Sequence, residues 1–148
     1  MDERLIEYLE SIVDIKYEKK EGYLYVEFIV TFNDKDVILK LYKGNNNIKM
    51  YFSFDCPICN SDVFMAMNEF NEKSDIYKAF HNGNDVIVEA FTYYKDDIET
   101  VRDMLDELLT DDYELVNNII NAIYKANSVD KFKVMEKIID DLGEDKDE

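Results

Sequence analysis

Two cysteines separated by two residues are the side chains with the clearest chemical potential. Cys56 and Cys59 form a Cys-x-x-Cys pair with Pro57 between them. Such a pair can supply half of a tetrahedral zinc site or act as a redox dithiol. A zinc site needs more ligands, and the chain has no second pair, although two copies could combine theirs. The simplest interpretation is two reduced thiols in a loop, with zinc binding and redox chemistry as the alternatives.

The remaining polar residues suggest no reaction. The single histidine, His81, opens a His-Asn-Gly-Asn turn, and no nucleophile stands in an obvious arrangement with it. Pairs of aspartates at 96–97, 111–112 and 140–141 lack the spacing of an EF-hand loop and are typical of helix caps and solvated faces. No glycine-rich phosphate loop is present. We therefore expect no catalytic residues, no cofactor and no enzymatic activity.

The charge of the chain restricts its partners. The 148 residues carry a formal net charge of −17 at pH 7, which repels phosphate backbones and anionic lipid. We expect neither nucleic acid nor a membrane surface as a partner. The charged start, Met1-Asp2-Glu3-Arg4, lacks the apolar region of a signal peptide, and no apolar run is long enough to cross a bilayer. These features predict a cytoplasmic protein with reduced cysteines.

Hydrophobic periodicity predicts a single α+β domain over residues 1–142 and an acidic mobile tail at 143–148. The strand at 23–32 alternates with one apolar face, formed by Leu24, Val26, Phe28, Val30 and Phe32. A sheet with one apolar face needs helices packed on that face. We therefore predict one antiparallel sheet of about five strands with helices on one side. The predicted order is α-β-β-β-α-β-β-α-α, over residues 3–14, 23–32, 37–43, 48–54, 61–73, 75–81, 85–93, 96–126 and 130–142.

Two helix boundaries carry capping signals. Asn60 or Ser61 can cap the helix that runs to residue 73. In the long helical region, Asp111 and Glu114 have capping-box spacing, which would allow a break near Thr110. The apolar stripe keeps its phase across that point, so we favour one long or bent helix.

Tyrosines concentrate on the other side of the predicted strands. The alternation directs Tyr23, Tyr25 and Tyr51 away from the apolar face, and Tyr77 alternates with Ile76 and Lys78. Tyrosine offers a large contact area at small entropic cost, which suits recognition surfaces. We identify Tyr23, Tyr25, Tyr51 and Tyr77 as candidate partner-binding residues. The alternative is a solvated sheet face, and a dimer interface would use the same side chains.

The element order resembles the YbjN-like family, within the type III secretion chaperone-like fold. The resemblance covers roughly residues 1–126 and is carried by Met67-Asn68-Glu69-Phe70-Asn71, by 76–80 and by 85–90. In that family a helix with an Asn-x-x-Asn element runs into a hairpin and then a long helix. The resemblance implies a small, acidic, often dimeric protein that binds segments of other proteins. It supplies no catalytic residues.

Three hypotheses of function follow. The first is a non-catalytic protein-binding module, chaperone-like or regulatory, whose acidic field selects a basic partner and which can form a homodimer. The second is a zinc-binding or redox protein that uses Cys56 and Cys59. The third is an acidic immunity or antitoxin protein, in which the negative charge mimics nucleic acid or neutralises a basic toxin.

Overall fold

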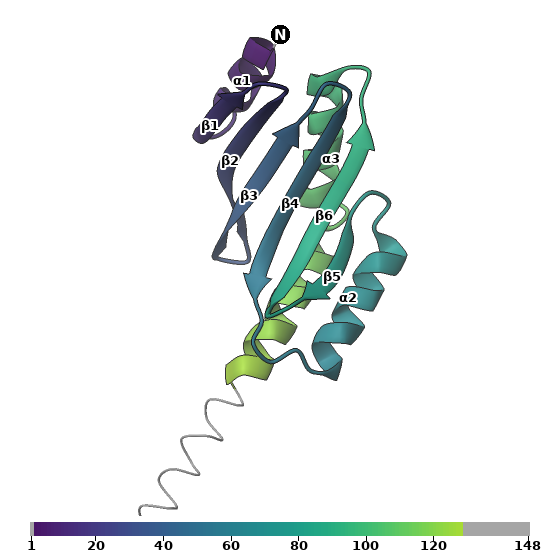
Figure 1. Cartoon of the computed structure of the whole chain (residues 1–148). Helices are drawn as coiled ribbons and strands as arrows, with labels where there is room; N and C mark the ends of the chain where they lie inside the picture. The colour runs from purple at the N-terminus through teal and green to yellow at the C-terminus, as the bar shows by residue number, and fades with distance from the viewer. Residues whose placement is uncertain (1, 129–148) are drawn as a thin grey trace, which may run out of the picture.

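The computed structural model describes residues 2–128, which form a sheet with helices packed on one face (Figure 1). The predicted helix at 130–142 and the tail at 143–148 lie outside the described residues. The helices are α1 (Asp2–Glu10), α2 (Ser61–Lys73), α3 (Asp97–Leu109) and a helical segment at 113–128. The strands are β1 (Ile15–Lys20), β2 (Tyr23–Phe32), β3 (Lys35–Lys43), β4 (Asn47–Asp55), β5 (Lys78–Asn82) and β6 (Asp85–Tyr93).

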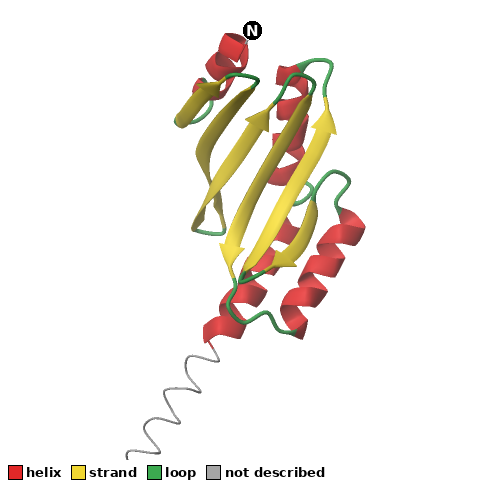
Figure 2. Ribbon diagram, viewed as in Figure 1, coloured by secondary structure: helices red, strands yellow, loops and turns green. Residues whose placement is uncertain are grey.

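The strands form one sheet in the order β1-β2-β3-β4-β6-β5, and every neighbouring pair is antiparallel. The predicted fold class is therefore confirmed. The described sheet has six strands, however, where about five were expected. Figure 2 shows the sheet as a single layer with the two ends of the order, β1 and β5, as its edges.

The additional strand is β1, which lies between the predicted first helix and the predicted first strand, where no element was expected. That helix was expected to reach residue 14, but α1 ends at Glu10. The sequence of β1 is Ile-Lys-Tyr-Glu-Lys-Lys, and five of its six residues are exposed. An edge strand of this composition lacks the apolar alternation by which strands are found in sequences.

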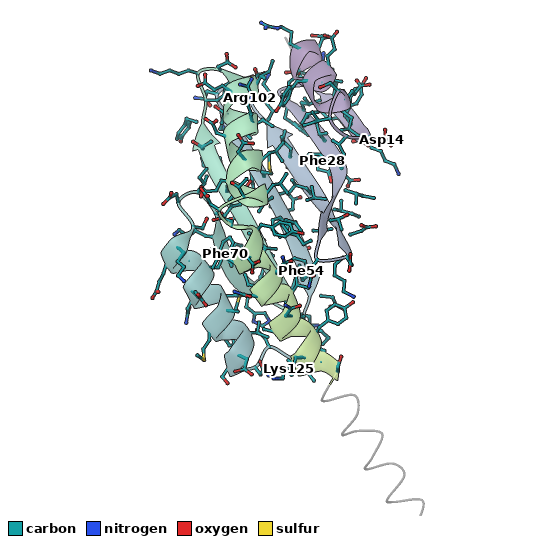
Figure 3. All side chains as sticks on the ribbon, turned by 180° about the vertical axis from the view of Figure 1, so that it is seen from behind. Asp14, Phe28, Phe54, Phe70, Arg102 and Lys125 are labelled. Atoms are coloured by element: carbon teal, nitrogen blue, oxygen red, sulfur yellow. The ribbon has the colours of Figure 1, made fainter. Side chains whose placement is uncertain are left out.

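The core lies between the sheet and the helices. The alternation in β2 behaves as predicted, since Leu24, Val26, Phe28 and Phe32 are buried and Val30 is half-buried. Phe70 of α2 and Leu108 of α3 are also fully buried. Seen from behind, α2, α3 and the segment 113–128 lie over the sheet (Figure 3).

The favoured interpretation, one long or bent helix through residue 126, was wrong, and the alternative of a break near Thr110 is what the structure has. α3 ends at Leu109, and a turn at 110–112 precedes the next helical segment. The Asp112 N–H donates to the Glu107 carbonyl, and the Val116 N–H donates to the Asp112 carbonyl. The side chain of Asp112 is buried at this turn. A buried carboxylate needs a hydrogen-bond donor, and that requirement outweighs the continuity of the apolar stripe.

The start of α2 was predicted correctly. Asn60 is its N-cap, and the Asn60 side chain accepts a hydrogen bond of 3.1 Å from the Val63 N–H.

A buried lysine of β3 connects this strand to α1 and α3. Lys43 of β3 donates to Asp2 of α1 at 2.7 Å and forms an ion pair with Asp97 of α3 at 2.8 Å. Burial opposes the charge of the lysine, but the two carboxylates prevail and raise its pKa.

No helix within residues 2–128 is both long and apolar enough to cross a membrane.

Candidate protein-binding face

The outer face of the sheet carries a connected set of tyrosines, which we call the tyrosine cluster: Tyr23, Tyr25, Tyr42 and Tyr51. The centre of the Tyr42 ring lies 4.7 Å from that of Tyr25, 5.8 Å from that of Tyr23 and 6.2 Å from that of Tyr51. Strand register produces this grouping, because Tyr25 stands directly opposite Tyr42. Cross-strand aromatic pairs of this kind also stabilise the sheet.

The cluster is open to solvent and continues toward β6. Tyr23 is 42% exposed and Tyr42 is 37% exposed. Phe91 and Tyr93 of β6 are more exposed still, and their rings meet edge to face at 5.6 Å. In Figure 1 no described helix crosses the middle of this face. A neighbouring group of exposed aromatic side chains on one face is typical of interaction surfaces.

Charged side chains form a balanced row beside the cluster. Across the strands, Lys16 stands opposite Glu27, and Glu27 stands opposite Lys40. The row continues through Tyr51 and Glu89 to Lys78 at the other edge. Opposite charges alternate along it, so this part of the surface is close to neutral in a strongly acidic chain. A partner can therefore approach the tyrosine cluster without facing a uniform field of acids.

The hydroxyls of Tyr25 and Tyr51 are held in the protonated form. Tyr25 Oη donates to Glu27 Oε1 at 2.5 Å. Partial burial, and then this bond, raise the pKa of Tyr25. Partial burial and the neighbouring Tyr42 raise the pKa of Tyr51, whose ring also has the amines of Lys49 and Lys40 over it, at 5.0 and 5.6 Å. At these two positions the face therefore presents neutral phenols with hydrogen-bonding capacity.

The structure places three of the four predicted tyrosines together and corrects the fourth. Tyr23, Tyr25 and Tyr51 lie on the outer face, and their role in binding stays a prediction. Tyr77 was wrongly placed there, since its side chain is 0% exposed and its hydroxyl donates to the Met104 carbonyl at 2.9 Å. Tyr42 was missed, although its parity with Lys40 in the predicted strand 37–43 would have revealed it.

The cysteine pair lies in the loop between β4 and α2. Cys56 is buried and its thiol donates to the Ile58 carbonyl at 3.4 Å, while Cys59 is half-buried. The loop is fastened to the helical segment 113–128 because the Asn127 amide bonds both backbone groups of Ile58, at 3.2 and 3.4 Å. Burial, and then the neighbouring Cys59, raise the pKa of the Cys56 thiol to about 11.

These features do not favour either chemical use of the pair. Redox-active and metal-binding cysteines have lowered thiol pKa values, because the thiolate is the reactive form. Within residues 2–128, no group of three or more His, Cys, Asp or Glu side chains is arranged to hold a metal ion. His81 is exposed at the end of β5 and makes an edge-to-face contact with the ring of Phe64.

Comparison with known proteins identifies a relative in fold. No family model and no curated protein matches the sequence. Among solved structures, the chain is similar to YbjN from E. coli, described as a candidate transcription regulator, with a TM-score of 0.50 and 15% sequence identity. The match covers 86% of this chain and 92% of YbjN. The fold is therefore YbjN-like, as the element order indicated, and at this identity the likeness concerns the fold alone.

Proposed function

We propose that this protein is a non-catalytic binding module that contacts another protein through the tyrosine cluster on the outer face of its sheet. The observation that carries the proposal is the set of ring contacts that centres on Tyr42 and joins Tyr25 and Tyr51. Aromatic residues at protein interfaces contribute much of the binding energy when they are desolvated together. Their strands hold them in place before binding, which lowers the entropic cost of association.

The charge distribution supports a basic partner protein, and we propose that the two meet in the cytoplasm. The net charge of −17 attracts basic proteins at long range, and the balanced row beside the cluster lowers the cost of desolvation at close range. The likeness to a candidate transcription regulator is compatible with this role if regulation proceeds through protein contacts. Direct binding to DNA is disfavoured, because the acidic chain and the phosphate backbone repel each other.

Site-specific photo-crosslinking tests the proposal. A benzophenone amino acid replaces Tyr42 or Tyr51 in the full-length chain, and Tyr124 of the segment 113–128, an exposed tyrosine remote from the cluster, serves as the matched control. The purified variants are irradiated in a lysate of the native cells, and adducts are identified by mass spectrometry. We expect one and the same basic protein to be linked from Tyr42 and from Tyr51 and not from Tyr124.

The binding energy is then measured with that protein in purified form. Tyr42→Thr and Tyr51→Thr keep a good strand-forming residue and remove the ring. We expect each to weaken binding by about tenfold or more, since interface aromatic residues contribute more than about 1 kcal/mol. Adducts that form equally from Tyr124, or binding that survives both substitutions, would refute the proposal. A basic toxin as the captured protein would assign the module to the immunity class.

A further inference from the structure

The two edges of the sheet differ in how their backbone groups are satisfied. At the β5 edge, the side-chain amide of Asn71 in α2 makes the two hydrogen bonds to Ala79 that a neighbouring strand would make. Its Nδ2 donates to the Ala79 carbonyl at 2.9 Å, and its Oδ1 accepts from the Ala79 N–H at 2.7 Å. At the other edge, β1 pairs only with β2, and no hydrogen bond among residues 2–128 reaches its outer backbone groups. The β1 edge is therefore the one open to further strand pairing.

The β1 edge also differs from the rest of the molecule in charge and polarity. Three of its six residues are lysines and one is glutamate, in a chain with a net charge of −17. Tyr17 of β1 is a large side chain that is 49% exposed. The lysines of this edge allow another acidic chain to approach it, and its exposed aromatic ring can be buried by a partner.

We propose that β1 pairs with β1 of a second copy of this chain, antiparallel and across a two-fold axis at Tyr17. Lys16 of each copy would then stand opposite Glu18 of the other. This inference is independent of the proposed function, because it leaves the tyrosine cluster free.

The register follows from strand geometry and charge. Directly opposed residues in an antiparallel pair point to the same face, so in a symmetric pair their numbers have the same parity. Two such registers align most of β1. One sets Glu18 against Glu18 and Lys16 against Lys20, which opposes like charges. The other sets Tyr17 against Tyr17 and Lys16 against Glu18 twice, which opposes unlike charges.

The preferred register also covers the exposed ring of Tyr17. Tyr17 pairs with Val26 of β2, which is buried, so Tyr17 lies on the helix side of the sheet. Two tyrosines at the two-fold axis would meet there and cover one another. Lys16 and Glu18 lie on the outer side, and the tyrosine clusters of both copies would share one continuous outer face.

Reversing the charges at positions 16 and 18, first singly and then together, tests the register. Lys16→Glu and Glu18→Lys each place like charges opposite one another, and the double variant restores unlike pairs. The matched control is Lys78→Glu at the β5 edge, because Lys78 faces Glu89 as Lys16 faces Glu27. The readout is molar mass by sedimentation equilibrium over a concentration series, against a chain mass of 17.5 kDa. Thermal unfolding confirms that each variant is folded.

We expect the wild-type chain to dimerise, each single reversal to raise the dimer Kd about tenfold, and the swap and Lys78→Glu to remain close to wild type. A wild-type chain that stays monomeric throughout the series overturns the proposal. So does a dimer that none of the substitutions weakens, because it must use another surface.

Disulfide trapping gives a second, independent readout. Tyr17→Cys brings two thiols together at the axis, where Cα atoms of opposed residues lie about 4.5–5.5 Å apart. Lys19→Cys is the control, because in this register Lys19 faces Ile15. We expect a covalent dimer from Tyr17→Cys under mild oxidation, and little from Lys19→Cys or from the wild-type chain. Equal cross-linking at both positions would contradict the register.

Discussion

Ser74 Oγ donates a hydrogen bond of 2.6 Å to Asp112 Oδ2 across 38 positions of sequence. Ser74 ends α2, and its hydroxyl also accepts from the Tyr77 N–H at 3.0 Å. Asp112 is only 1% exposed, and its other oxygen, Oδ1, has no hydrogen-bond partner among the described residues. A buried carboxylate is thus held by one hydroxyl at the turn that separates α3 from the segment 113–128.

The buried carboxyls predict a fold that becomes more stable on mild acidification. Burial raises the pKa of Asp112, and burial together with the charge of Asp112 raises the pKa of Glu107. A carboxyl with a raised folded-state pKa contributes stability that is fully present below its ordinary value, 3.8 for Asp and 4.5 for Glu. That contribution is lost as pH rises through the folded-state value. We expect a higher melting temperature at about pH 5 than at about pH 7.5.

Asp112→Asn separates this effect from the general loss of negative charge on acidification. The variant cannot titrate at position 112, so its melting temperature should change less between the two pH values. Ser74→Ala provides the complementary test. It leaves the carboxylate without a donor and should cost about 1–3 kcal/mol at neutral pH. The cost should shrink at acidic pH, where the group is neutral, and an equal cost at both values would argue against a charged Asp112.

Tyr77→Phe should lower the free energy of unfolding by about 1 kcal/mol without affecting the binding face, because it removes one buried hydrogen bond to the Met104 carbonyl. Tyr23→Phe is the matched control on the outer face and should change stability by less than about 0.5 kcal/mol. Urea unfolding measures both. Equal effects would contradict the assignment of Tyr77 to the core.

The regular elements were predictable because their signals are local. The alternation from Leu24 to Phe32 and the cap at Asn60 each lie within a few residues of chain, and both behave as expected. Long-range contacts were not predictable. Tyr77 precedes β5, so no strand pattern places its side chain, and its hydroxyl donates to a carbonyl of α3. The site of Asp112 likewise exists only once Ser74 has been folded against it.

The candidate site was also predictable only in its local features. Parity within strands places Tyr23, Tyr25 and Tyr51 on one face, but the spacing between them depends on register across strands. The strand β1 could not be recognised, because an edge strand with lysines at half of its positions has no buried alternation. Hydrophobic periodicity could therefore not predict the proposed dimer edge.

Asn71→Ala should cost about 1–3 kcal/mol, because it exposes both backbone groups of Ala79 at the β5 edge. Asn68→Ala is the matched control, since Asn68 belongs to the same Asn-x-x-Asn element but is exposed on α2. It should change the free energy of unfolding by less than about 0.5 kcal/mol. Asn71→Ala should also aggregate more readily on partial heating, measured by light scattering. Similar costs for the two variants would show that the amide does not protect the edge.

The two cysteines should differ in reactivity in the folded chain. Cys59 is half-buried and should be alkylated by N-ethylmaleimide at neutral pH, whereas Cys56 should react slowly because it is buried and its thiol pKa is about 11. Peptide mass spectrometry after timed quenching measures both rates, and the chain in urea, where both should react alike, is the control. The rate at Cys56 should rise with pH up to its pKa as thiolate forms. Fast modification of Cys56 at neutral pH, or zinc in the freshly purified protein, would contradict a structural role and restore the metal or redox hypothesis.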